Sequence, residues 1–234
     1  MSRYVVYRRF NFLPNAVTTL SGHTTNMPPF KSIAKSGPSL FRDVYYDLAS
    51  KIFTENNFVL RTRNGVWKAM ENKPEVFTAF EHRNFNLKRE FVDRVEIHKF
   101  INENLALQQG SVDSDGIQGG PLPTSPTFNF ALKIQAEMNI KRTSYLIDGK
   151  MTVHLDNIIE SGYRTGLIED VMKIEKGASY NTVLGIAHER RKAIDGMMNQ
   201  YHWFFRRLPE DEHPIDGKLV VYLEDKASGY TYHY

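Results

Sequence analysis

The sequence predicts an α+β domain built on antiparallel β-hairpins. Short segments rich in β-branched and aromatic residues recur along the chain, as expected for strands. Two connections between such segments, Asn64-Gly65 and Asp148-Gly149, are typical of tight hairpin turns, because these residues accept positive φ. One long segment, 179–208, instead has apolar residues three and four positions apart, which is the spacing of an amphipathic helix.

The predicted strands are residues 4–13, 41–46, 57–63, 66–70, 76–85, 134–146, 151–155, 166–174 and 218–223. The segment 91–107 is apolar at spacings closer to those of a helix, although the secondary structure of its first residues is ambiguous. The segment 179–208 is the clearest helix, and Pro209 ends it. The Met and aromatic residues along this helix are expected to form core contacts.

Two long segments between the predicted elements have the composition of loops. Residues 14–41 carry four prolines among serine, threonine and glycine, and residues 109–127 consist largely of glycine, serine, proline and aspartate. Structureless loops of this length are uncommon inside a compact domain. We therefore expect the first to be functional or partly disordered, and the second to be a loop or linker.

The composition excludes several classes of protein. The chain has 234 residues, a formal net charge of +3, 41% hydrophobic residues and no cysteine. These values are ordinary for a globular protein, and the lack of cysteine excludes a disulfide framework, a cysteine nucleophile and a thiolate metal site. No apolar run is long enough to predict a transmembrane helix. The sequence also contains no P-loop, dinucleotide-binding, zinc-protease or nucleophile-elbow motif.

The N-terminal 42 residues carry six Lys and Arg residues and no acidic residue. This composition is typical of a mitochondrial targeting segment. A basic strand followed by a polar loop would have the same composition, so a cytoplasmic location is the alternative.

Several cations fall on predicted strands. Arg61 and Arg63 are two residues apart on one strand and therefore point to the same face. Lys68 lies on the next strand. If the strands curl into one sheet, these cations converge on its concave side, where guanidinium groups match phosphate oxygens. From the pattern alone, however, solvated charges on an outer face are the simpler interpretation.

The order of the segments resembles a known family. The chain begins with YVVYRRF, continues with FRDVYYDLASKIFTENNFVLRTRNGVW and IKRTSYLIDGKMTVHLDNIIESGYRTGLIED, and ends with GKLVVYLEDKASGY. This series is similar to the CYTH family of triphosphate tunnel enzymes, and within it to the thiamine triphosphatases. The resemblance implies a closed tunnel of about eight antiparallel strands. It also implies a single domain over residues 1–234, with insertions at about 14–41 and 109–127.

In this family one wall of the tunnel holds a triphosphate through Arg and Lys, and the other holds Mg²⁺ or Mn²⁺ through acidic residues. The resemblance places the phosphate-binding positions at Arg9, Arg61, Arg63, Arg142 and Lys218. One family lysine falls at Met70, and Lys68 on the same face could replace it.

The acidic wall departs from the family pattern. The first-strand glutamates fall at Val5 and Tyr7, and two further acidic positions fall at His154 and Leu167. Asp156 and Glu169 are the acids that remain as candidate metal ligands. Other carboxylates that could replace the lost ones are Asp43, Asp47 and Glu81.

These departures lead to three alternatives for function. The first is a catalytically degenerate protein that retains a basic tunnel for a polyphosphate-type anion, needs no cofactor, and serves as a binding or structural subunit. The larger assembly would be mitochondrial, such as the ribosome of that organelle, with protein or RNA partners. The second is a divergent thiamine triphosphatase or tripolyphosphatase that uses Mg²⁺ or Mn²⁺. The third is a sensor that binds a nucleotide or polyphosphate without turnover.

Overall fold

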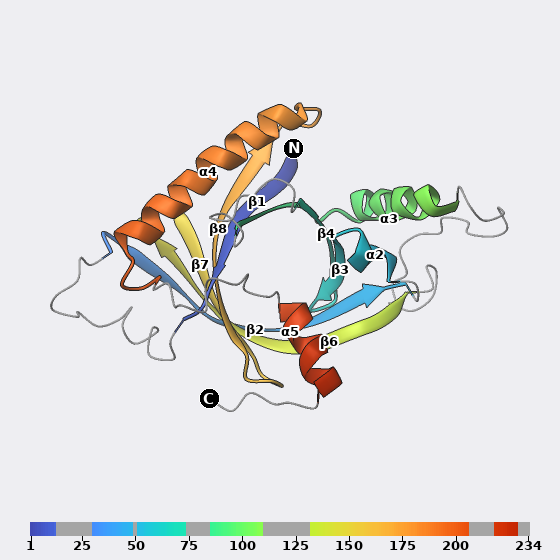
Figure 1. The fold of residues 1–234 in the computed structure, drawn as a ribbon, viewed down its shortest axis with the longest axis horizontal. Coiled ribbons are helices and arrows are strands. Elements are labelled where there is room, and N and C mark those ends of the chain that lie inside the picture. The colour runs from blue at the N-terminus through green and yellow to red at the C-terminus, as the bar shows by residue number, and fades with distance from the viewer. Residues whose placement is uncertain (13–29, 49–50, 74–84, 110–131, 206–217, 229–234) are drawn as a thin grey trace.

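The structure, a computed structural model, describes residues 1–12, 30–48, 51–73, 85–109, 132–205 and 218–228. Its centre is a closed antiparallel barrel with the strand order β1-β5-β4-β3-β2-β6-β7-β8 (Figure 1). The strands are β1 (Ser2–Phe10), β2 (Ile33–Asp47), β3 (Phe58–Arg63), β4 (Val66–Lys73), β5 (Phe85–Phe91), β6 (Lys133–Ile147), β7 (Met151–Ile158) and β8 (Arg164–Ile174). The flanking helices are α2 (Ile52–Glu55), α3 (Arg94–Gln109), α4 (Tyr180–Gln200) and α5 (Lys218–Ser228). This architecture confirms the predicted antiparallel barrel with helices around it.

Strand β1 closes the barrel, because it pairs with β5 on one side and with β8 on the other. The pairing with β8 runs from Ser2 opposite Ile174 to Phe10 opposite Gly166. A closed barrel presents no strand edge to a neighbouring chain. The basic segment at residues 2–10 is therefore a structural part of the barrel.

Both hairpin turns predicted from the sequence are present. Asn64 and Gly65 join β3 to β4 with φ values of 48° and 79°, and Asp148 and Gly149 join β6 to β7 with φ values of 53° and 65°. Positive φ at both central residues is the backbone geometry that matches the twist of the flanking strands. The two turns set the register of the strands that carry several of the predicted site residues.

The outer face of the barrel is covered by helices. Under α4, the outward side chains Val6 and Ile168 pack against Val183, Ala187 and Ile194 of the helix. Helix α4 runs beside β1 and β8, while α3 lies on the other side of the barrel near β4 and β5 (Figure 1). Since side chains alternate between the two faces of a strand, the positions between these apolar residues point into the barrel.

Helix α4 begins where it was predicted and ends earlier. Ser179 is its N-cap, as expected for a serine at that position. The helix stops at Gln200 rather than continuing to 208, and the chain turns there. Phe204 still packs edge-on against Phe10 of β1, with ring centroids 6.0 Å apart. The apolar spacing beyond Gln200 therefore came from core contacts and not from a continuing helix.

The helix predicted at 91–107 is α3, shifted by three residues at its start. Phe91 is the last residue of β5, and the helix begins at Arg94. The carboxylate of Asp93 accepts the backbone N–H groups two and three residues further on, at 2.9 and 3.1 Å, and so caps the first turn. The predicted strand at 76–85 lies outside the described residues except for its last residue. The predicted linker at 109–127 does so except for Gln109.

The prediction of a strand at 218–223 is wrong, because these residues form the start of helix α5. The sequence KLVVYL has strong strand propensity, but β1 already closes the barrel and leaves no edge for another strand. As a helix, the segment buries Val221 and Tyr222. Tyr222 packs with Phe41 and Tyr45 of β2. Tertiary contacts therefore override the local preference.

The loop predicted at 14–41 is partly wrong, since β2 begins at Ile33. The segment pairs with β6 from Ile33 opposite Ile147, and the register shifts between Ser36 and Ser39. Pro38 lies at this irregularity, where a residue without a backbone N–H is tolerated. Residues 13–29 lie outside the described part of the chain.

Gly166 on β8 is predicted to be intolerant of a side chain. A Cβ at this position would lie inside the contact distance of the Phe10 ring, which the aromatic residues after α4 hold in place. We expect Gly166→Ala to lower the free energy of unfolding by about 1–3 kcal/mol, as measured by urea denaturation. Gly185→Ala is the control, because nothing lies near the Cβ that it would add. An unchanged unfolding midpoint for Gly166→Ala would contradict this packing.

Candidate functional site

The barrel encloses a cavity of about 330 Å³ that is lined by side chains from all eight strands of the barrel and from α5. The predicted site residues all line it: Arg9, Arg61, Arg63, Lys68, Arg142, Lys218, Asp156 and Glu169. The simpler interpretation of these cations, as solvated charges on an outer face, is therefore wrong. Their role as ligands for phosphate stays a prediction.

Lys218 reaches this cavity from a helix rather than from the predicted strand. Helix α5 lies beside β6 (Figure 1). From the first residue of α5 the Lys218 ammonium donates to Asp156 of β7 at 2.5 Å. The resemblance therefore identified a tunnel residue correctly although the element that carries it was assigned incorrectly.

Three further charged residues of the cavity were not found from the sequence. Arg3, Lys88 and Glu90 also line it. Lys88 and Glu90 lie on β5, whose sequence FNLKREF alternates outward Phe85 and Leu87 with inward polar residues. That alternation could have predicted a strand with inward polar residues. It was missed because residues 86–90 lie between the strand predicted at 76–85 and the helix predicted at 91–107.

Cations outnumber carboxylates around the cavity. Eight Lys and Arg side chains line it, together with the carboxylates of Glu90, Asp156 and Glu169. A fourth carboxylate, Asp43, is fully buried beside the arginines of β3. In a partly enclosed space the attraction between this excess of positive charge and an anion exceeds that of the same charges in open water.

Asp43 neutralises part of the basic wall. Its carboxylate accepts from Arg61 Nη1 at 2.8 Å, and from Arg63 Nε at 2.7 Å and Nη2 at 2.6 Å. Burial works against ionisation, yet the hydrogen bond from Arg63 and the charges of both arginines lower the pKa of Asp43 below its usual range. Asp43 is thus a positioning partner for two predicted phosphate ligands.

Asp156 is enclosed in the same way. Arg142 donates to both of its oxygens, at 2.6 and 2.7 Å, and Lys218 donates to Oδ2. Despite burial, the charges of Lys218 and Arg142 and their hydrogen bonds keep the pKa of Asp156 far below normal. A carboxylate whose two oxygens are held by protein cations is poorly placed to bind a metal ion.

Glu169 is paired with the histidine that replaces a family acid. His154 Nε2 lies 3.2 Å from Glu169 Oε1, and His154 Nδ1 lies 2.7 Å from Ser144 Oγ. Although burial opposes it, the hydrogen bond with His154 and the positive charge of Lys88 lower the pKa of Glu169 to about 2. Both ring nitrogens of His154 therefore have hydrogen-bond partners, so neither is free to bind a metal ion.

The residues present do not fit the Mg²⁺ or Mn²⁺ site that the resemblance implies. No group of three or more His, Asp or Glu side chains suited to a metal ion occurs among the described residues. Asp43 is held by two arginines, and Asp47 accepts backbone N–H groups at the start of α2. Glu81 lies outside the described residues. Hard divalent cations need accessible oxygen ligands, and these carboxylates already have cationic or N–H partners.

Two buried polar atoms of the cavity wall lack a hydrogen-bond partner among the described residues. They are Arg61 Nε and Thr165 Oγ1. Buried polar groups are normally satisfied, and an exception often indicates a place for a bound group. At three of the positions where the resemblance implies acids the side chain is not acidic but largely apolar: Tyr7 and Leu167 line the cavity, and Val5 is fully buried.

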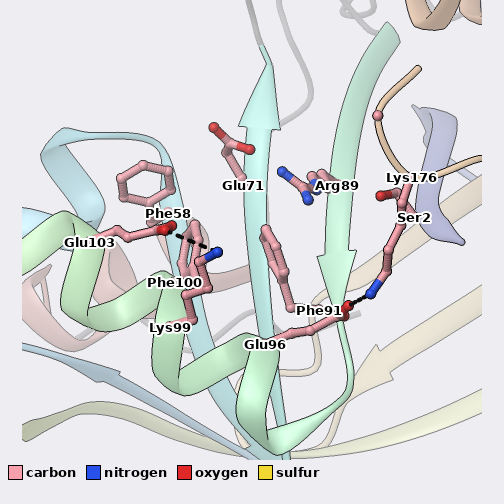
Figure 2. Close-up of a pocket in the computed structure, with 11 residues that line it drawn as sticks. Ser2, Phe58, Glu71, Arg89, Phe91, Glu96, Lys99, Phe100, Glu103 and Lys176 are labelled. Atoms are coloured by element: carbon pink, nitrogen blue, oxygen red, sulfur yellow. Dashed lines mark hydrogen bonds and ion pairs between the residues drawn. The ribbon is translucent and has the colours of Figure 1, made fainter. Parts of the chain in front are cut away.

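A second, larger cavity of about 580 Å³ lies outside the barrel, between α3 and strands β4 and β5. Figure 2 shows the rings of Phe58, Phe91 and Phe100 in this cavity, with charged side chains around them. Four of these charges form two ion pairs, Lys176 with Glu96 at 2.6 Å and Lys99 with Glu103 at 3.6 Å. None of the predicted site residues lines this cavity, so we place the candidate site inside the barrel.

No family model matches this chain, and no curated protein matches it. Among solved structures the chain is similar to a candidate adenylyl cyclase from Hippeastrum that is described as having a dominant triphosphatase activity. The two chains share 13% identity and a TM-score of 0.47, over 99% of this chain and 98% of that chain.

Two candidate adenylate cyclases are similar in the same way. The one from Vibrio parahaemolyticus has 12% identity and a TM-score of 0.48, over 94% of this chain and 99% of that chain. The one from Bacillus halodurans has 13% identity and a TM-score of 0.47, over 95% and 99%. The closed antiparallel tunnel predicted for the present chain is confirmed by its own strand pairing.

A membrane span was not expected from the sequence. Among the described residues, no helix has both the length and the apolar character that crossing a membrane requires.

Proposed function

We propose that the barrel binds a polyphosphate-type anion without hydrolysing it, and that the protein acts as a binding subunit. The observation that carries this proposal is the cavity itself, where eight cationic side chains meet three carboxylates. The carboxylates are held by cations or by histidine, which supports anion binding and argues against a catalytic metal.

The cations differ in how available they are to a ligand. Arg142 and Lys218 are held by Asp156, and Arg61 and Arg63 by Asp43. Lys68 makes no ion pair among the described residues, and burial together with the nearby charges of Arg61 and Arg63 lowers its pKa. A bound anion would relieve this repulsion, so Lys68 is the cleanest probe of the site.

Calorimetric titration with inorganic tripolyphosphate in EDTA tests the proposal. We expect binding that is insensitive to EDTA and weakens as salt rises, because salt screens charge attraction. Lys68→Met is expected to lower the affinity about tenfold. Lys141→Met is the control, since Lys141 is an exposed lysine on β6. Absence of tripolyphosphate binding by the unmodified protein would refute the proposal.

A phosphate-release assay tests the alternative that the protein is a hydrolase. Asp156 and Glu169 both line the cavity, as that alternative requires. We expect no appreciable release from thiamine triphosphate or tripolyphosphate with Mg²⁺ or Mn²⁺. A turnover on the order of 1–10³ s⁻¹, which is typical of enzymes, would instead establish a metal-dependent triphosphatase.

Binding is expected to depend on pH through Lys218. Burial and the charges of Arg142 and Arg61 lower the pKa of Lys218 to about 8, although Asp156 opposes the shift. The cavity therefore loses one positive charge as the pH rises from 7 to 9, and affinity for tripolyphosphate should fall several-fold. Lys218→Arg keeps its charge in this range and serves as the reference, which also controls for ionisation of the ligand. Identical pH profiles for the two proteins would contradict this prediction.

We also propose that the protein belongs to a larger assembly in the mitochondrion. The acid-free first 42 residues and the long inserted segments support contact with acidic partner chains or RNA. Sizing of the native protein at mild salt, before and after ribonuclease treatment, tests this. Migration as a monomer of 27.1 kDa would refute it.

A further inference from the structure

Lys88 lies on the wall of the barrel where the resemblance leads one to expect metal ligands. In the register of β5 with β1, Lys88 is opposite Val5, and Tyr7 is opposite Glu169 on β8. Val5 and Tyr7 stand at the two first-strand acidic positions. The Lys88 ammonium lies 5.2 Å from the centre of the Tyr7 ring. The chain therefore has a lysine beside the site from which two carboxylates have been lost.

Glu90 does not neutralise Lys88 by itself. Lys88 Nζ lies 2.9 Å from Glu90 Oε1, while Arg3 Nε donates to the other oxygen, Oε2, at 2.7 Å. Two cations thus share one carboxylate. The charge of Lys88 also helps to lower the pKa of Glu169. An ammonium has three N–H donors, and the contact with Glu90 accounts for one of them.

We propose that Lys88 supplies, as a fixed protein charge, the positive charge that a divalent metal would bring to this wall, and that it contacts the bound anion directly. The inference rests on the proposed anion-binding function. It adds a binding residue that the resemblance did not provide, and it explains why binding needs no metal.

The position of Lys88 also excludes a metal from the same place. The Lys88 ammonium repels a second cation placed near Glu90 and Glu169, and it already holds Glu90 Oε1, an oxygen that a metal would need. Asp156, the other acid that remains on this wall, is held by Arg142 and Lys218. Arg61 and Arg63 line the cavity from the basic wall. With Lys88 on the acidic wall, a phosphate chain would have donors on each side of it.

Substitutions at Lys88 test the inference, with tripolyphosphate as the probe and calorimetry in EDTA as the measurement. Lys88→Met is expected to lower affinity about tenfold or more, because a charge-assisted contact is lost. Lys88→Arg keeps the charge and is expected to bind within a few-fold of the unmodified protein. Lys141→Met, the exposed control on β6, is expected to bind normally.

Lys88→Glu tests the exchange of lysine for metal. It places a third carboxylate beside Glu90 and Glu169, so tripolyphosphate binding should be lost in EDTA and partly restored by Mg²⁺. Thermal unfolding of each variant separates loss of binding from loss of structure. If Lys88→Glu does not fold, the comparison of Lys88→Met with Lys88→Arg tests the inference instead. Unchanged affinity of Lys88→Met would overturn the role of Lys88 and leave the proposed function standing. Absence of binding by the unmodified protein would overturn the proposed function and this inference with it.

Discussion

Replacing Arg61 and Arg63 together by alanine is expected to lower the free energy of unfolding by about 3–5 kcal/mol. Asp43 is fully buried, and its carboxylate accepts from these two arginines. Removing both leaves a buried charge without its two hydrogen-bonded partners. The burial that now opposes ionisation of Asp43 would then be countered only by the charge of Lys218. Urea denaturation at pH 7 measures the loss.

A triple variant separates this charge effect from loss of packing. Adding Asp43→Asn to the two alanine substitutions removes the unpaired charge, so we expect it to recover part of the lost stability. The control is Arg42→Ala, which removes an exposed arginine paired with Glu137 on the outer face. Surface pairs of this kind contribute about 0–1 kcal/mol. Equal stability of the double and triple variants would show that Asp43 is not the cause.

The same reasoning changes which variants report on anion binding. Arg61 and Arg63 are the most specific matches to the family pattern, yet both are tied to the folding of the barrel through Asp43. Replacing Lys68 or Lys88 is not expected to leave a buried carboxylate without a partner. Lys68 makes no ion pair among the described residues, and Arg3 still holds Glu90 when Lys88 is removed. Loss of binding in the double alanine variant would mix two effects that the lysine variants keep apart.

Local patterns predicted the parts of the fold that local chemistry determines. The turns at Asn64-Gly65 and Asp148-Gly149 and the N-cap at Ser179 each follow from the residues themselves. Closure of the barrel does not, because it depends on β1 pairing with β5 and β8, far along the chain. The predicted strand at 218–223 failed for that reason. Its residues favour a strand, but the closed sheet has no edge to accept one.

The candidate site was predicted where residues matched the family pattern position by position, and at Lys68, which shares a strand face with the replaced position Met70. The predicted cations line the cavity, and so do Asp156 and Glu169. The pairing within the site could not be predicted, because the contacts of Asp156 with Lys218 and of Glu169 with His154 cross between elements whose register the sequence does not specify. Because of these contacts, Asp156 and Glu169 bind protein side chains instead of standing free as metal ligands.

Placing acids at three positions where the resemblance implies them is expected to make anion binding in the tunnel depend on metal. The variant combines Val5→Glu, Tyr7→Glu and Leu167→Glu, which places three carboxylates on the wall that holds Glu169. In EDTA these charges repel a polyanion, so tripolyphosphate affinity should fall by about two orders of magnitude. Mg²⁺ is expected to recover most of it, because the new oxygens supply ligands that the unmodified protein lacks. Calorimetry with and without Mg²⁺ measures both changes.

The matched control carries glutamine at the same three positions. Glutamine has nearly the shape of glutamate without its charge, so this control is expected to fold similarly and to gain no response to Mg²⁺. Lys88 is expected to compete with Mg²⁺ for the new carboxylates, because a glutamate at position 5 would lie opposite it. Adding Lys88→Met should therefore strengthen the Mg²⁺ response of the glutamate variant, since the competing cation is gone. A glutamate variant that still binds tripolyphosphate in EDTA as the unmodified protein does would mean that residues 5, 7 and 167 do not face the bound anion. The proposed independence of anion binding from metal would then need another cause.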